Sequence, residues 1–126
     1  MSRTILLIED NVQNRYLTTY LLERSGYTVA AAEDGPSGIA LAAAAAPDLI
    51  LLDINVPVMD GYAVARKLRQ LPETRRVPIV AVTSYAMAGD REKALAAGCD
   101  GYIEKPIDPE TFVSEIEQML ANMPPV

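Results

Sequence analysis

The stretch from Leu49 to Asp53 constrains the fold more strongly than any other part of the chain. Four aliphatic residues lead directly into Asp53, and Pro57 and Gly61 interrupt the chain soon afterwards. A short apolar run between such chain-breaking residues is typical of a strand that is buried on both faces of a parallel sheet. Asp53 is therefore expected at the carboxyl end of a central strand, where open α/β sheets bind their ligands.

Similar short apolar runs alternate with helical patterns along the rest of the chain. The other strands are expected at residues 4–8, 27–31, 79–82 and 101–104, and helices at about 11–25, 36–46, 62–71, 88–97 and 108–120. In the first helix, Leu17, Tyr20 and Leu21 have the spacing of a buried apolar stripe, and Asn11 or Asn14 can cap its start. Five strands alternating with five helices predict an α/β fold, a doubly wound parallel sheet with helices on both faces.

Length and charge limit the classes of function. A chain of 126 residues suits one domain, expected at residues 1–121 with a short tail at 122–126. With 11 basic and 17 acidic residues, the net charge of −6 argues against nucleic-acid binding. A solvated helix face and loop explains the basic residues that cluster, which are Arg66, Lys67, Arg69, Arg75 and Arg76. No apolar run is long enough to span a membrane.

The chain contains one cysteine and no histidine. Cys99 cannot form an internal disulfide, which fits the reducing cytoplasm, and it is interpreted as a small packed residue near a turn. The lack of histidine excludes histidine-based catalytic triads, histidine-ligated metal sites and a role as a phosphohistidine carrier.

Polar residues follow four of the expected strands: Glu9-Asp10, Asp53, Thr83-Ser84 and Lys105. The carboxyl ends of parallel strands share one edge of the sheet, so these residues should converge there. Three crowded carboxylates raise one another's pKa unless a cation offsets them, and oxygen-only ligands suit Mg²⁺. A lysine and a threonine hydroxyl can bind phosphoryl oxygens, and an aspartate can be the nucleophile that forms an acyl phosphate. The pattern therefore predicts phosphorylation of Asp53.

The same residues, in this order and at this spacing, resemble the receiver domain of bacterial two-component response regulators. The resemblance extends over the whole chain and implies a flavodoxin-like, CheY-like sheet with strand order 2-1-3-4-5. Residues 80–90 are most similar to stand-alone cell-cycle receivers of the DivK type, and receivers attached to hybrid histidine kinases look similar too. Few residues follow the last helix, so we expect either a whole single-domain regulator or a domain excised from a longer chain.

The resemblance implies a role for each residue at this edge. Asp53 would accept a phosphoryl group from the phosphohistidine of a sensor histidine kinase or a histidine phosphotransfer protein. Asp10 and Asp53 would bind Mg²⁺ directly, Asn55 would add its backbone carbonyl, and Glu9 would act mainly through water. Lys105 would pair with the phosphoryl oxygens. The chain would thus promote only Mg²⁺-dependent phosphorylation and dephosphorylation of its own Asp53, and would not otherwise be an enzyme.

The resemblance also implies how the signal leaves the site. Thr83 and Tyr102 would form a switch, and Ser84 is small enough to leave room for the phosphoryl group. Pro57 and Pro106 would line the site, and the peptide bond before Pro106 is expected to be cis.

The surface of the fourth helix, fifth strand and fifth helix, roughly residues 86–120, would bind a downstream protein or a second copy of the chain. By the same resemblance, Asn55 and Tyr85 correspond to positions at which family members vary and tune the phosphoryl lifetime.

Two alternative functions remain from the sequence. A phosphatase of the haloacid dehalogenase type also has an aspartyl nucleophile, but it needs a second aspartate where this chain has Asn55. A constitutive docking domain would leave a complete set of site residues unused. Taken singly, the acid pair could start a helix, Lys105 could be a surface lysine and Tyr102 could be a core residue.

Overall fold

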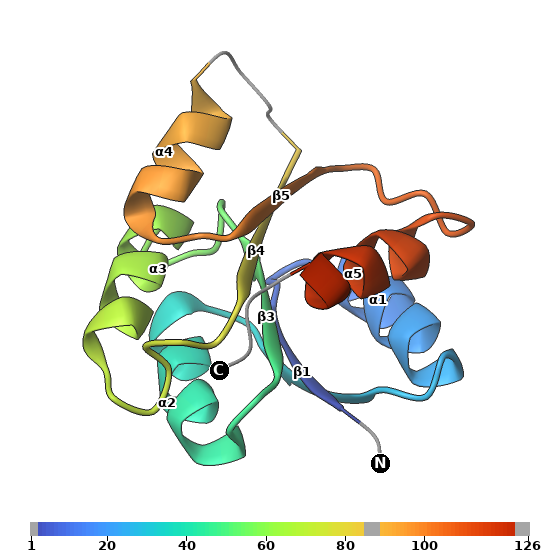
Figure 1. Ribbon diagram of the computed structural model, residues 1–126, viewed down its shortest axis with the longest axis horizontal. Helices are drawn as coiled ribbons and strands as arrows, with labels where there is room; N and C mark the ends of the chain where they lie inside the picture. Colours follow the sequence, from blue (N-terminus) through green and yellow to red (C-terminus); the bar gives the residue numbers. More distant parts are fainter. Residues whose placement is uncertain (1–2, 85–88, 123–126) are drawn as a thin grey trace.

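Five parallel strands form one sheet in the order β2-β1-β3-β4-β5, which confirms the predicted topology (Figure 1). The computed structural model describes residues 3–84 and 89–122. The strands are β1 (Thr4–Ile8), β2 (Thr28–Ala32), β3 (Leu49–Asp53), β4 (Ile79–Thr83) and β5 (Gly101–Glu104). The helices are α1 (Val12–Arg24), α2 (Gly35–Ala45), α3 (Gly61–Gln70), α4 (Asp90–Ala97) and α5 (Phe112–Asn122).

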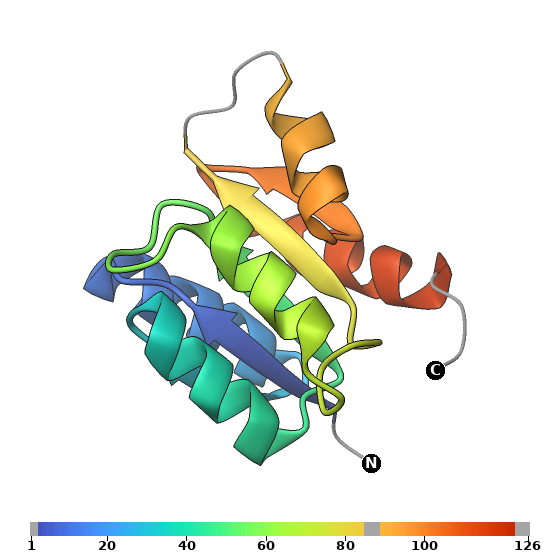
Figure 2. The ribbon, with the colours of Figure 1, turned by 90° about the vertical axis from the view of Figure 1, so that its left-hand side faces the viewer.

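Helices cover both faces of the sheet, with α1 and α5 on one side and α2, α3 and α4 on the other (Figures 1 and 2). The central strand β3 is buried along its whole length, and its side chains alternate between the two cores. Leu49 and Leu51 pack into the core beneath α1 and α5, whereas Ile50 and Leu52 pack into the core beneath the other three helices. Each such burial contributes about 1.5–3 kcal/mol, so β3 fixes the position of Asp53 at its end.

The predicted apolar stripe of the first helix is wrong for two of its three residues, and only Leu21 is partly buried against the core. In α1 the buried residues are Thr18 and Leu22, while Leu17 and Tyr20 are 37% and 50% exposed. The helix is turned so that a threonine faces the sheet, which hydropathy alone does not indicate. Asn11 caps the helix, because its side chain accepts a hydrogen bond from the backbone of Asn14 at 2.9 Å.

The last helix starts later than the sequence predicts. The last helix begins at Phe112 and not near residue 108, because Asp108 first closes a turn through its side chain to Glu110 N (3.0 Å) and its carbonyl to Phe112 N (2.9 Å). The predicted start of the fourth helix, at residue 88, lies outside the described residues.

The register of the sheet aligns the strand ends that carry the polar residues. Ile8 pairs with Leu52, Asp53 with Val82, and Thr83 with Glu104. Residues that are distant in sequence therefore meet at one edge. Within the described ranges, no helix is both long and apolar enough to cross a membrane.

Candidate functional site

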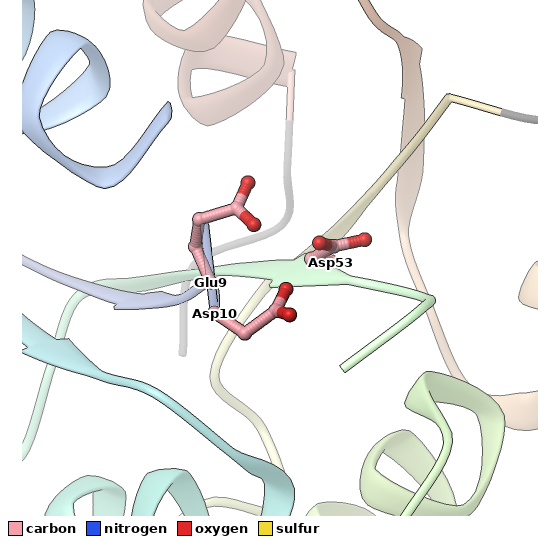
Figure 3. Close-up of side chains that lie close together, drawn as sticks. All are labelled: Glu9, Asp10 and Asp53. Carbon is pink, nitrogen blue, oxygen red and sulfur yellow. The ribbon is translucent and has the colours of Figure 1, made fainter. Parts of the chain in front are cut away.

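Three carboxylates meet at the carboxyl edge of the sheet, as the sequence predicts. Glu9 and Asp10 follow β1, Asp53 ends β3, and one oxygen of each lies within 4.8 Å of the others. Figure 3 shows the three side chains gathered at the ends of the two neighbouring strands. Glu9 and Asp53 are only 3% and 6% exposed, whereas Asp10 is open to solvent. The side chains of Glu9 and Asp53 are thus buried, and that of Asp10 is accessible to solvent.

Lys105 reaches these acids from the loop that follows β5. Its Nζ donates to Glu9 Oε1 at 2.5 Å and to Asp53 Oδ2 at 3.3 Å, and its side chain is 9% exposed. The peptide bond between Lys105 and Pro106 is cis, as expected. The cluster therefore sets one ammonium group against three carboxylates.

The surroundings shift the pKa values of Glu9 and Lys105. Burial and the neighbouring Asp53 carboxylate raise the pKa of Glu9 to about 7, although Lys105 acts in the opposite direction. Burial by itself would lower the pKa of Lys105, but the hydrogen bond to Glu9 and the charge of Asp53 outweigh it and raise that pKa. Lys105 is thus a firmly charged cation in a site with excess negative charge.

Backbone contacts fix the orientation of the acids. Asn55 donates its backbone N–H to Asp53 Oδ1 at 3.0 Å, and Asn11 donates its own to Glu9 Oε2 at 3.2 Å. Arg15 donates to the backbone carbonyls of Glu9 (2.9 Å) and Asp10 (3.4 Å). Sequence reasoning missed Arg15, since nothing in its spacing separates it from an ordinary surface residue of α1.

The loop between β3 and α3 is tightly packed at one point and strained at another. Gly61 donates to Ile54 O at 2.8 Å, and a Cβ at Gly61 would stand 2.5 Å from Ile54 Cα. Only glycine therefore lets α3 start this close to the strand that carries Asp53. Val58 has a φ of 74° and is 85% exposed, and a left-handed conformation is unfavourable for a β-branched residue.

The other predicted site residues differ in how deeply they are buried. Thr83 is buried at the end of β4, and its carbonyl accepts a hydrogen bond from Lys105 N at 2.7 Å. Ser84 is exposed and lines, with Lys105 and Pro106, a cavity of about 340 Å³ next to α1. Pro57 is exposed in the loop after β3. Tyr85 lies outside the described residues.

Tyr102 lies on β5, partly buried against the core beneath α3 and α4. Its hydroxyl oxygen is buried and has no hydrogen-bond partner in the part of the chain that the structure describes. A buried hydroxyl without a partner costs about 1–3 kcal/mol.

The three carboxylates form a suitable Mg²⁺ site. Their ligand atoms are all oxygens within 4.8 Å of one another, and Mg²⁺ prefers a small number of carboxylates with several retained waters. The exposure of Asp10 leaves one side of the cluster open to such waters. A divalent cation there would also offset the excess negative charge.

Comparison with known proteins agrees with this geometry. Residues 5–117 match the family model of the response regulator receiver domain. The polar-differentiation response regulators DivK of Brucella ovis and of Brucella abortus (strain 2308) are each 38% identical over 122 residues, which cover 97% of this chain and 99% of theirs.

Two solved structures are similar throughout the fold. The receiver domain of sensor histidine kinase PA1611 from Pseudomonas aeruginosa PAO1, with a magnesium ion coordinated in the active site cleft, is 35% identical. It gives a TM-score of 0.88 and covers 97% of this chain and 100% of that one. The chemotaxis response regulator CheY4 of Vibrio cholerae is 28% identical, with a TM-score of 0.89 and coverage of 94% and 99%. The chain therefore belongs to the response regulator receiver domains, the signal-receiving modules of two-component phosphorelays.

Proposed function

We propose that Asp53 is the phosphoryl acceptor of this receiver, and that a sensor histidine kinase or a histidine phosphotransfer protein is the donor. The observation that carries the proposal is the position of Asp53. Its side chain is buried at the edge of the sheet beside two further acids, and its Oδ2 lies 3.3 Å from Lys105 Nζ. The proposal takes residues 1–121 as one receiver domain with a tail at 122–126, in the cytoplasm where such donors act.

In the transfer, an oxygen of Asp53 attacks phosphorus as the bond between phosphorus and the donor's histidine nitrogen breaks. The electron pair of that bond returns to the imidazole, and the aspartate becomes an acyl phosphate. Lys105 lies where its ammonium group can pair with the phosphoryl oxygens, and Asn55 N–H holds Asp53 Oδ1 in place. Transfer of this kind depends chiefly on positioning and on neutralising charge.

Mg²⁺ would be held by the carboxylates of Asp10 and Asp53 and the backbone carbonyl of Asn55, with Glu9 acting through water. When bound, it supplies positive charge that reduces repulsion between these acids and the incoming phosphoryl group. The magnesium ion in the active site cleft of the PA1611 receiver, which shares 35% of its sequence with this chain, supports the assignment.

The exposed face of α1 is a suitable contact for the donor. Val12, Tyr16 and Tyr20 recur every four residues along it and are 67%, 75% and 50% exposed. Large apolar side chains gathered on a surface indicate binding of another protein. The helix starts directly after the acid pair, so a protein that covers this face can bring its histidine to Asp53.

The proposal also includes the route by which phosphorylation reaches a partner. New phosphoryl oxygens beside Thr83 would attract its hydroxyl, and Tyr102 would respond to the space that Thr83 leaves. The surface of α4, β5 and α5 would then change its affinity for a downstream protein or a second copy of the chain. Residues 86–88 of this surface lie outside the described residues.

Phosphorylation by acetyl phosphate tests the acceptor directly. In the presence of Mg²⁺, intact-mass spectrometry should show one added phosphoryl group per chain, and Asp53→Asn or excess chelator should abolish it. Equal labelling of Asp53→Asn, or labelling that is indifferent to chelator, would overturn the assignment.

The contact of the donor with α1 is tested separately. Tyr16→Ser should slow transfer from a protein donor while leaving labelling by acetyl phosphate unchanged.

A double-mutant cycle tests the switch. Thr83→Ala and Tyr102→Ala should each weaken phosphorylation-dependent partner binding while Asp53 is still labelled. The double variant should lose less binding free energy than the sum of the two single losses, because the two residues act through one rearrangement. Fully additive losses would show that the signal takes another route.

A further inference from the structure

The outer side of β5 carries a groove that the phosphorylation chemistry does not use. It has a volume of about 560 Å³ and runs between β5 and one face of α5. Gln118, Met119 and Asn122 of α5 line it at helical spacing, and Ile103 and Tyr102 line it from the strand. Figure 1 shows β5 as the outermost strand on this side of the sheet, near α5.

The groove runs along an open strand edge. β5 pairs with β4 on one side, and within the described residues no strand pairs with its other side. The outward N–H and C=O groups of such an edge can pair with an added strand of another chain.

The charge of the groove indicates what kind of strand would fit. Four carboxylates line it, from Asp100, Glu104, Asp108 and Glu115, and no lysine or arginine is among its described lining residues. Arg69 neutralises only Asp100, at 2.6 Å. The other three acids are exposed and form no ion pair in the parts of the chain that the structure describes.

We propose that this groove binds an extended basic segment of a partner protein, which adds a strand to the edge of β5. Main-chain hydrogen bonds to β5 would hold the segment. Alternate side chains of an added strand point to the same face, so arginines or lysines at every second position would lie toward Asp108 and Glu115. The inference deepens the proposed function, on which it rests for the view that this surface binds a partner, by stating the partner's chemistry.

The test uses a synthetic peptide and the unphosphorylated protein. The probe is an acetylated and amidated eight-residue peptide in which arginine and threonine alternate, and its binding is measured by calorimetry at low salt. Amide chemical shifts should change most along residues 101–104 and on the facing side of α5. The double variant Glu104→Lys/Glu115→Lys should weaken binding at least about tenfold, since charge reversal at an interface is strongly unfavourable.

Two controls separate this binding from general attraction to an acidic protein. The variant Glu23→Lys/Glu73→Lys makes the same change in net charge at exposed positions away from the groove, and it should bind the peptide nearly as well as the native chain. A peptide of the same sequence with alternate backbone nitrogens methylated cannot pair as a strand, and it should bind much more weakly.

Three results would overturn the proposal: no binding of the probe, equal weakening by both double variants, or equal binding of the methylated peptide. The acids would then serve only to keep the strand edge from pairing with other chains. Labelling of Asp53 by acetyl phosphate is measured in the same samples. Absent peptide binding with normal labelling would reject the groove alone, whereas groove-dependent binding without labelling would support the groove and reject the acceptor.

Discussion

Lys105 and Arg69 each occupy the centre of a hydrogen-bonded group, at opposite ends of the same sheet. At the carboxyl end, Lys105 contacts two carboxylates, and a third lies within the same cluster. At the amino end, the guanidinium of Arg69 donates to Asp100 at 2.6 Å and to four backbone carbonyls, those of Gly98, Thr74, Arg75 and Val77. Both groups join segments that are distant in sequence.

The two groups differ in their charge. Arg69 meets one carboxylate, and its remaining partners are neutral, so its donors are satisfied and its charge is matched. Asp100 in turn accepts from Ile79 N at 3.0 Å, which ties β4 to the turn before β5. When all three acids are ionised, Lys105 leaves two negative charges unmatched. A matched group stabilises the fold, whereas an unmatched one is a place where a cation and a phosphoryl group can bind.

The largest effect is expected from removing Arg69. Arg69→Ala should lower the free energy of unfolding by roughly 2 kcal/mol, because partly buried carbonyls and Asp100 lose their hydrogen-bond donor. Urea unfolding measures this loss. Cys99 is buried, and it should also be alkylated faster in the variant, because a less stable chain opens more often and exposes the thiol.

Arg66→Ala is the matched control for this change. Arg66 is exposed on the same helix, and its removal should change stability by less than about 0.5 kcal/mol. Equal effects of the two substitutions would show that the network of Arg69 is an ordinary set of surface contacts.

A smaller effect of opposite sign is expected at the other end. Without divalent cations, Asp10→Asn should raise stability by about 0.5–1 kcal/mol, because it removes one repelling charge and no ion pair. Mg²⁺ at ten times its Kd should stabilise the native chain by about 1.4 kcal/mol, and this gain should disappear in Asp10→Asn. Thermal unfolding with Mg²⁺ and with chelator gives both numbers, and Glu73→Gln is the control. Destabilisation by Asp10→Asn in chelator would contradict the view that the acids repel.

The smallest effect concerns the strained loop beside Asp53. Val58→Asn should raise stability by about 0.5–1 kcal/mol, because asparagine tolerates a positive φ better than a β-branched residue does. The affinity for Mg²⁺, measured by calorimetry, should stay unchanged. A loss of stability would mean that contacts of the valine outweigh its backbone strain.

Much of the carboxyl end could be predicted from the sequence, and little of the amino end. Glu9, Asp53 and Lys105 each follow a recognisable strand, and a parallel sheet requires such ends to meet at one edge. Arg69 was interpreted with its neighbours as part of a solvated face. That interpretation holds for the other exposed residues of the group but is wrong for Arg69, because its partners are backbone carbonyls of loops that carry no sequence signal.

The orientation of α1 shows the same limit. Leu17 and Tyr20 have the spacing of a core stripe, yet Thr18 and Leu22 occupy the buried positions. Spacing predicts that a helix has a buried face, but the choice between neighbouring faces depends on packing against the sheet. Of these two exposed residues, Tyr20 belongs to the face that we assign to donor binding.

The most direct test of the account is to locate the phosphoryl group on the native chain. Borohydride reduces an aspartyl phosphate to homoserine, so peptide mapping after reduction identifies the modified position without any substitution. After incubation with acetyl phosphate and Mg²⁺, we expect homoserine at position 53 alone, and none when a chelator is present. Conversion at Asp10, Asp60 or another acid in place of Asp53, or conversion that persists in chelator, would contradict the account.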